Sequence, residues 1–211
     1  MDVVIIGAGG HGRVVADILA LARQHRVVGF LDADESLVGT KVGDLPVLGG
    51  TNLLARLKRE QRARGAIVAI GDNRVRARYA EEVLAAGLEL VCAVHPSAVV
   101  APSARVGAGS VIAAGAVVCV AATLGDNCIV NTAAVVDHEC DVAEGVHVCP
   151  GALLAGRVKV GERAFIGLGA RVIQCLSVGA DAVVGAGAVV LRDVPAGARV
   201  AGVPARTIES S

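Results

Sequence analysis

Three consecutive ionisable residues, Asp137, His138 and Glu139, interrupt a segment that otherwise consists mainly of alanine and valine. A carboxylate can hold one nitrogen of an imidazole, which fixes the tautomer and raises the basicity, while the other nitrogen takes a proton from a reacting group. The cluster therefore predicts general-base chemistry with His138 as the base. Glu139 and Asp137 are both candidates for the partner carboxylate. Pairing with Glu139 requires a corner in the chain, because adjacent strand residues point to opposite faces.

A six-residue repeat positions this cluster. From Val94 to Val190, every sixth residue is Val, Ile or Leu, seventeen positions without a break. The residue four places later is nearly always small, and the residue one place later is often Gly, Asn or Asp. A period of six fits neither a helix nor a simple alternating strand. It predicts short strands joined by corners, three to a coil of about eighteen residues, with coils stacked about 4.8 Å apart.

We therefore expect a parallel β-solenoid of five to six coils over residues 94–195. The Gly, Asn and Asp residues one place after the aliphatic position would supply the unusual backbone angles of the corners. Composition agrees with this expectation, because 54% of the residues are apolar but only 1% are aromatic, which suits layers of identical cross-section. The uncharged run 106–125 is long enough for a membrane helix, but its unbroken repeat indicates part of the solenoid.

Residues 1–93 show a different pattern. A buried strand at 3–6 enters the loop Gly7-Ala8-Gly9-Gly10-His11-Gly12, a helix follows over 13–23, and a strand at 27–31 ends at Asp32. A third strand at 67–70 precedes the loop Gly71-Asp72-Asn73 and a helix that ends near residue 86. This alternation predicts a small parallel α/β sheet, half of a Rossmann fold. The glycine loop would present backbone N–H groups to phosphate, with Asp32 at a ribose or base; the alternative is a tight turn without a ligand.

Net charge and cysteine content limit the possible binding partners and the cellular compartment. The formal net charge is zero, which gives no electrostatic reason to expect nucleic acid or an anionic membrane. The chain starts with a strand pattern and not with a signal peptide, so we expect six reduced cysteines and a cytoplasmic protein. Cys140 and Cys149 occupy ordinary repeat positions, which disfavours an acyl-cysteine intermediate. His25 is interpreted as solvated surface and His95 as structural.

The repeat resembles the hexapeptide-repeat acyltransferases, and the segment Val200–Arg206 resembles their closing segment near coenzyme A. With the glycine-loop domain, the whole chain resembles bacterial acetyltransferases of nucleotide-linked amino sugars, which are grouped with the sialic acid O-acetyltransferase-like proteins. The resemblance implies an α/β half-Rossmann domain (1–93), an all-β left-handed parallel β-helix (94–195) and a tail near coenzyme A (196–211). It also implies a homotrimer with active sites between neighbouring subunits.

The implied reaction transfers an acetyl group from acetyl-CoA to the amine of a UDP- or GDP-linked 4-amino-4,6-dideoxy sugar, by direct attack and without a metal, in cell-surface polysaccharide biosynthesis. His138 would be the base and Glu139 its partner, and the Gly156 N–H would stabilise the oxyanion. The residues implied for the nucleotide sugar are Gly9, His11, Gly12, Asp32, Gly71, Asp72, Asn73 and Asn131. Those implied for acetyl-CoA are His147, Ile166, Gly167, Gly185, Gly202 and Pro204.

Three other functions remain open at this point. The same base would serve O-acetylation of a sugar hydroxyl, such as that of a sialic acid. A metal hydratase resembling the γ-type carbonic anhydrases would need three histidines on one zinc ion, and the solenoid offers only His138 and His147. An inert binding solenoid leaves both the Asp-His-Glu cluster and the glycine loop unexplained.

Overall fold

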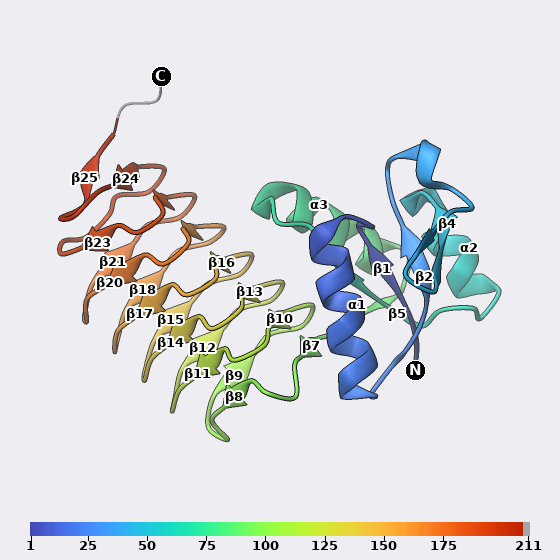
Figure 1. The fold of residues 1–211 in the computed structure, drawn as a ribbon, viewed down its shortest axis with the longest axis horizontal. Helices are drawn as coiled ribbons and strands as arrows, with labels where there is room; N and C mark the ends of the chain where they lie inside the picture. Colours follow the sequence, from blue (N-terminus) through green and yellow to red (C-terminus); the bar gives the residue numbers. More distant parts are fainter. Residues whose placement is uncertain (209–211) are drawn as a thin grey trace. The chain divides into compact units, whose positions relative to one another are not determined.

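The computed structural model describes residues 1–208, so the last three residues of the predicted tail lie outside the described residues. The chain forms two compact units, Met1–Pro96 and Ser97 onward. The first unit alternates strands and helices, whereas the second consists of short strands joined by turns (Figure 1). The predicted fold class, a Rossmann-like α/β unit followed by a parallel β-helix, is confirmed.

The first unit is built on a six-stranded sheet in the order β3–β4–β2–β1–β5–β6. All neighbours pair in parallel except the β3–β4 hairpin. The strands are β1 Asp2–Ile6, β2 Arg26–Leu31, β3 Lys41–Val42, β4 Leu45–Gly49, β5 Gly65–Val68 and β6 Glu89–Leu90, followed by β7 Ala93–Val94. The helices are α1 Gly10–Ala22, α2 Leu54–Arg59 and α3 Asn73–Ala85, with short 3-10 turns at Glu35–Leu37 and Thr51–Leu53.

Alternation along β1 separates the two faces of this sheet. Val4 and Ile6 belong to a core that includes Leu54 and Leu57 of α2 and also α3. Val3 and Ile5 point to the opposite face and are also fully buried. The third strand lies two residues earlier than the sequence indicated, at 65–68, and the β3–β4 hairpin and α2 were not predicted.

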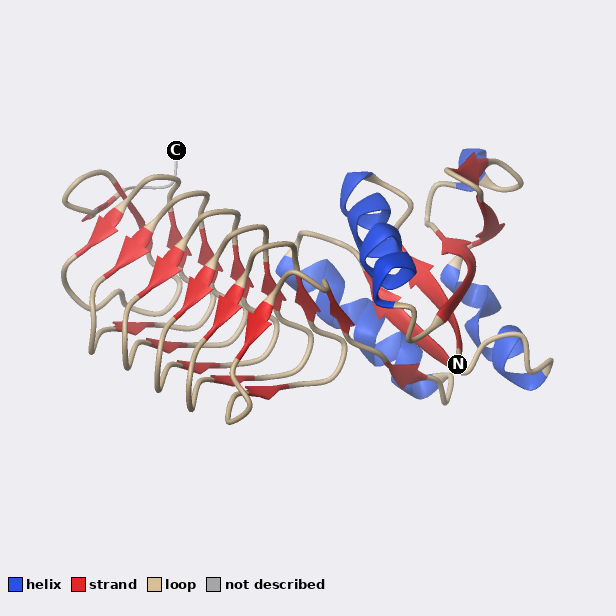
Figure 2. Cartoon of the chain, turned by 60° about the horizontal axis from the view of Figure 1, so that its bottom comes forward, coloured by secondary structure: helices blue, strands red, loops and turns tan. Residues whose placement is uncertain are grey.

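The second unit coils with a period of eighteen residues. Val117 and Val118 pair in parallel with Val135 and Val136, and the other coils repeat this register. Three sheets result, one for each side of the coil, and Figure 2 shows the strands of successive coils in line on each side. The first side contains β10 Val111–Ile112, β13 Ile129–Val130, β16 His147–Val148, β19 Phe165–Ile166, β22 Val183–Val184, β24 Arg199–Ala201 and β25 Arg206–Thr207.

The second side contains β8 Val99–Val100, β11 Val117–Val118, β14 Val135–Val136, β17 Leu153–Leu154, β20 Arg171–Val172 and β23 Val189–Val190. The third side contains β9 Arg105–Val106, β12 Thr123–Leu124, β15 Asp141–Val142, β18 Lys159–Val160 and β21 Ser177–Val178. The eighteen-residue register ends after β23, because Arg199 of β24 pairs with Val183 of β22. The strands β24 and β25 close the unit as an antiparallel hairpin.

The repeated aliphatic residues fill the interior of the coils. From Ile112 to Val190, every one of them is at most 2% exposed. Burying each such side chain contributes about 1.5–3 kcal/mol, so the repeat itself stabilises the unit. The uncharged run 106–125 lies within β9 to β12, and among residues 1–208 no helix is long and apolar enough to cross a membrane.

The corners of the coil differ from the sequence expectation. Every sixth residue from Gly109 to Gly187 has a positive φ, three places after the inward aliphatic residue and not one place after it. Several of these corner residues are not glycine, including Glu139 (φ 57°) and Arg157 (φ 61°). The glycines one place after the aliphatic residue are required for a different reason. A Cβ on Gly107 would lie 2.4 Å from the backbone of the next coil.

Candidate active site

His138 and Glu139 form a pair at the corner between β14 and β15. The His138 Nδ1 lies 3.2 Å from the Glu139 Oε2. The positive φ of Glu139 supplies the corner that this pairing requires. At this corner the Glu139 side chain turns back toward the His138 ring. Glu139 accepts a hydrogen bond from Arg157 and from His138, and these two contacts lower the pKa of its carboxyl group. The carboxylate is therefore ionised, and Nε2 is the ring nitrogen left for a substrate.

Asp137 has a different task. Its Oδ1 accepts a hydrogen bond from the backbone N–H of His138 at 2.7 Å. Burial, followed by the nearby Asp137 carboxylate, raises the pKa of the Cys119 thiol one coil earlier. Asp137 thus fixes the backbone at the corner, and the structure places Glu139, not Asp137, on the imidazole.

Gly156 lies one coil after His138, directly against its ring. A Cβ at this position would be 2.4 Å from the His138 Nε2. Among the described residues, no group accepts a hydrogen bond from the Gly156 N–H. A peptide N–H without an acceptor, in a residue that lies against the His138 ring, is a group that can stabilise an oxyanion formed nearby.

Arg157 also belongs to this site, although its side chain was not selected from the sequence. Its Nε donates a hydrogen bond to the Glu139 Oε2 at 3.0 Å. The sequence contains a usable signal for it, because Arg157 follows Glu139 by the eighteen residues of one coil.

Asn131 and His147 form a second polar group, at the first side of the coil. The Asn131 Nδ2 lies 3.1 Å from the His147 Nε2, and the Asn131 Oδ1 accepts from the Thr132 N–H at 2.8 Å. His147 is 7% exposed and packs edge-on against Phe165, with the ring centroids 5.3 Å apart. Since the amide oxygen is engaged by Thr132, the amide nitrogen donates to Nε2 and the His147 proton resides on Nδ1.

These two groups occupy different corners of the same chain. Asn131 follows β13, at the corner between the first and second sides, whereas His138 follows β14, at the corner between the second and third sides. A single chain therefore brings together His138, Glu139 and Gly156, and separately Asn131 and His147.

The glycine loop lies at the carboxyl end of β1 in the first unit. Gly12 packs so closely that a Cβ would lie 2.0 Å from the Gly7 oxygen, whereas Gly9 and Gly10 face open space. The Asp32 Oδ2, at the end of β2, accepts from the Ala8 N–H at 2.7 Å. The Asp32 carboxylate therefore fixes the loop to β2. The exposed residues of the loop, Gly9 and Gly10, lie at the N-terminus of α1.

The loop Gly71–Asn73 lies at the same edge, because it follows β5, the neighbour of β1. Asp72 caps α3, and its Oδ1 accepts from the N–H groups of Arg74 and Val75. Two helix N-termini, those of α1 and α3, thus meet at one edge of the sheet, which favours an anion there. Gly71 is exposed, whereas Asn73 is 8% exposed.

A buried arginine supports this edge. Arg76 is fully buried, and its Nη1 donates to the carbonyl oxygens of Ile70 and Gly71 at 3.1 and 3.4 Å. Burial, together with the Arg76 charge, lowers the pKa of His11 to about 4. His11 is therefore neutral near pH 7 and contributes to the loop as a polar group without charge.

Comparison with known proteins identifies the family. The PglD N-terminal domain model matches residues 2–83. The chain is 33% identical over 157 residues to GDP-perosamine N-acetyltransferase of Escherichia coli O157:H7, covering 73% of this chain and 70% of that protein. The crystal structure of PerB from Caulobacter crescentus in complex with CoA and GDP-perosamine is 45% identical, with a TM-score of 0.93 over 99% of this chain and 98% of that one.

The acetyltransferase domain of PglB from Neisseria gonorrhoeae FA1090, in complex with acetyl coenzyme A, is 43% identical, with a TM-score of 0.91 over 98% of both chains. The chain belongs to the hexapeptide-repeat sugar N-acetyltransferases. The family and the enzyme class predicted from the sequence are thereby confirmed, with acetyl-CoA as the co-substrate.

The residues that the sequence assigned to acetyl-CoA are spread along the solenoid of this N-acetyltransferase. The Ile166 side chain is fully buried inside the coil, so only its backbone could meet a ligand. A Cβ on Gly167 would lie 2.5 Å from the Val184 oxygen, so this glycine permits close coil stacking. Gly202 and Pro204 are exposed in the loop between β24 and β25. A Cβ on Gly185 would lie 3.0 Å from the Ala201 Cβ in the same region.

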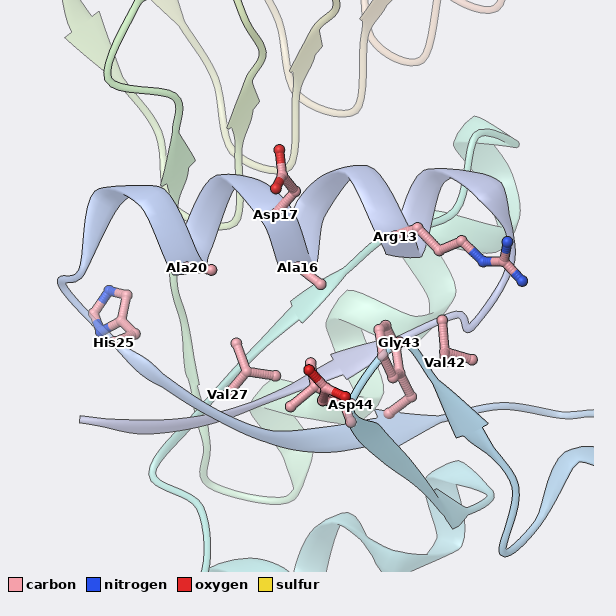
Figure 3. Close-up of a pocket in the computed structure, with 11 residues that line it drawn as sticks. Arg13, Ala16, Asp17, Ala20, His25, Val27, Val42, Gly43 and Asp44 are labelled. Carbon is pink, nitrogen blue, oxygen red and sulfur yellow. The ribbon is translucent and has the colours of Figure 1, made fainter.

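The acetyltransferase also has a cavity of about 720 Å³ in its first unit, beside α1 and the β3–β4 turn. Figure 3 shows Arg13 at one end of it and His25 at the other. None of the residues predicted to bind the nucleotide lines it. The interpretation of His25 as solvated surface is wrong, because the ring is half-buried here and this burial lowers its pKa.

In the part of the chain that the structure describes, none of the six cysteines of the acetyltransferase forms a disulfide, and Cys140 and Cys149 are buried. Burial raises the pKa of the Cys140 thiol, which disfavours the thiolate that an acyl-cysteine intermediate would need. Within residues 1–208, no group of three or more His, Cys, Asp or Glu side chains is arranged to hold a metal ion.

Proposed function

We propose that this chain transfers the acetyl group of acetyl-CoA to the amino group of a GDP-linked 4-amino-4,6-dideoxy sugar of the perosamine type. The observation that carries the proposal is the similarity to PerB, 45% identical over nearly the whole of both chains and bound to CoA and GDP-perosamine. The similarity includes the first unit, whose glycine loop and two helix N-termini form an anion-favouring edge.

His138 acts as the general base in the proposed mechanism. Its Nε2 takes a proton from the sugar amine as the amine nitrogen attacks the thioester carbonyl carbon. The new C–N bond converts the carbonyl into a tetrahedral oxyanion, which the Gly156 N–H stabilises. The C–S bond then breaks, the sulfur receives the proton from His138, and free coenzyme A leaves. Glu139 holds Nδ1 throughout and stabilises the transient imidazolium.

The nucleotide part of the acceptor binds at the edge formed by the two loops of the first unit. Gly9, Gly12 and Gly71 leave the backbone accessible to the diphosphate, and Asp72 and Asn73 begin α3 beside it. Asp32 lies where it can contact the ribose or base while it holds Ala8. His11 contributes a neutral ring to the same edge.

The active form is a homotrimer in this proposal. His138 and the Asn131–His147 pair lie on different corners of one coil, so a site that contains both requires two chains. Asn131 would approach the acceptor, and His147 would approach the acetyl carbonyl through its Nδ1–H. Gly167, Gly185, Gly202 and Pro204, with the backbone of Ile166, would line the coenzyme channel between chains.

The biological setting follows from the substrates. Acetyl-CoA and nucleotide sugars are made in the cytoplasm, so we place the enzyme there, in the supply of acetylated sugars for cell-surface polysaccharide. Neither nucleic acid nor a membrane is a partner in this scheme.

The test is release of coenzyme A from acetyl-CoA by the purified chain, with GDP-perosamine, UDP-linked 4-amino-4,6-dideoxy sugars and free sialic acid as acceptors. We expect turnover with GDP-perosamine and a loss of about 10²- to 10⁴-fold in kcat/KM for His138→Ala. Turnover only with a UDP-linked sugar would change the nucleotide assignment. Turnover only with sialic acid would establish the O-acetylation alternative instead.

A further inference from the structure

We propose that Arg157 is a positioning residue for this reaction: it holds the Glu139 carboxylate against the His138 ring. The inference rests on the proposed function, in which His138 is the base. Arg157 itself touches neither ring nitrogen and acts through Glu139.

The backbone places Arg157 where it can do this. Its N–H donates to the His138 carbonyl oxygen at 2.9 Å, so residue 157 stacks on the 138–139 corner. Arg157 and Glu139 have nearly the same positive φ, 61° and 57°. Because equivalent residues of successive coils are about 4.8 Å apart and leave the backbone in the same direction, the two side chains lie side by side.

Both donors use the same carboxylate oxygen. The Arg157 Nε is 3.0 Å and the His138 Nδ1 is 3.2 Å from the Glu139 Oε2. The Glu139 side chain is 54% exposed and would otherwise be free to rotate in solvent. The guanidinium therefore fixes the rotamer that brings Oε2 to the ring.

Other titratable groups surround this corner but do not replace Arg157. On the same coil, Asp137 accepts from the His138 backbone N–H, and burial raises the pKa of Cys140. On the preceding coil, burial raises the pKa of the Cys119 thiol, which therefore stays uncharged at neutral pH. On the following coil, Cys175 occupies the next corner position and interacts with Arg157.

Arg163 provides a matched control. It occupies the same position in the next hexad, with a φ of 56°, and it also forms an ion pair between coils. Its Nε and Nη2 donate to Asp181 at 3.1 and 3.0 Å. Arg163 also donates to Glu162 at 2.8 Å. Arg163 and Asp181 belong to a different corner row from that of Glu139 and Arg157, so Arg163→Gln removes an ion pair between coils that lies away from the base.

The experiment measures the pH profile of kcat/KM for GDP-perosamine with Arg157→Gln, Arg157→Lys and Arg163→Gln. We expect Arg157→Gln to lower kcat/KM at neutral pH about three- to tenfold, the range of a modest ion pair. It should also move the acid limb of the profile to lower pH, in the direction expected for Glu139→Gln, because a carboxylate that Arg157 no longer holds leaves the imidazole without its anionic partner. Arg157→Lys should restore the wild-type limb, and Arg163→Gln should leave the profile unchanged.

A double mutant tests whether Arg157 acts through Glu139. In a Glu139→Gln background, Arg157→Gln should cause no further change in kcat/KM or in the acid limb. An acid limb that does not move in Arg157→Gln, or an equal loss in the Glu139→Gln background, overturns this inference while the proposed function stands. Absence of wild-type turnover with every nucleotide-linked amino sugar overturns the proposed function, and this inference with it.

Discussion

The imidazole of His138 occupies the space in which a side chain on Gly156 would lie. A Cβ on Gly156 would be 2.4 Å from the His138 Nε2 and 2.5 Å from the Cε1, distances that no such pair of atoms adopts. Residue 156 follows residue 138 by one coil, so the stacking of the solenoid creates this contact. The missing side chain makes room for the ring, so the Gly156 backbone lies directly against it.

We expect Gly156→Ala to lower kcat/KM about 100-fold, because displacing a catalytic group by about 1 Å has a cost of that order. The imidazole is 43% exposed and can swing outward, so the ring moves and the backbone stays. The melting temperature should therefore fall by less than about 4 °C. Enzyme kinetics and thermal unfolding of the same preparation measure both quantities.

Gly151→Ala is the control for that substitution. Gly151 has a φ of 65° with no atom within 4 Å of a Cβ, and Ala133, one coil earlier, already adopts a φ of 55°. Wild-type kcat/KM is expected. A comparable loss of activity in Gly151→Ala, or full activity in Gly156→Ala, would show that the contact with His138 does not matter for the reaction.

The two carboxylates beside His138 should differ in effect. Glu139→Gln removes the charge that holds Nδ1. We expect kcat/KM to fall about 10- to 100-fold, which is a fraction of the rate enhancement that general-base catalysis provides. The acid limb of the pH profile should move to lower pH, because a protonated imidazole loses its anionic partner. Asp137→Asn keeps an oxygen that can accept from the His138 N–H, so its profile should match that of the wild type. The opposite ranking would return the orienting role to Asp137.

Periodicity made much of this site predictable. A spacing of eighteen residues places Gly156 on His138 and Arg157 on Glu139, and both relationships could be computed once the coil length was known. The backbone angles were not predictable in the same way. Glycines at 107 and 179 suggested corners one place after the aliphatic residue, but they reflect close stacking of coils, and the positive φ lies at residues such as Glu139 and Arg157.

The first unit shows a different limit. The strand, loop and helix pattern around the glycine loop located the anion-favouring edge, because parallel neighbours end at the same edge of a sheet. Nothing local in the sequence showed that Asp32 would bind the Ala8 N–H, or that Arg76 would be buried beneath Gly71. These contacts join segments that are far apart in the chain, and only the packed sheet brings them together.

His11 should make the first unit sensitive to acid. Its pKa is about 4 in the folded chain and about 6.5 when unfolded, so the unfolded state binds more protons between these values and stability falls as the pH drops from 6.5 toward 4. We expect a loss of about 2 kcal/mol between pH 7 and pH 5 from this group. Denaturant unfolding of the wild type and His11→Gln at both pH values measures it. An equal pH dependence in the two proteins would mean that His11 is not the source.

The hydrogen bonds around Asn131 assign a single tautomer to His147. The Asn131 Oδ1 accepts from Thr132, so Nδ2 donates to Nε2 and the ring carries its proton on Nδ1. Nitrogen NMR of the imidazole should show this Nδ1–H form in the wild type. In Asn131→Asp the carboxylate would need a proton on Nε2, so we expect the other tautomer or a protonated ring.

If His147 contacts the acetyl carbonyl through Nδ1–H, the neutral tautomer produced by Asn131→Asp loses that donor. We then expect kcat/KM for acetyl-CoA to fall at least tenfold, the cost of one hydrogen bond to developing charge. Asn131→Gln is the control, because it keeps a neutral amide but moves it. The comparison separates the effect of the new carboxylate charge from the effect of displacing the amide. An Nε2–H ring in the wild type would contradict the assignment. A changed tautomer with unchanged kinetics would remove His147 from the reaction.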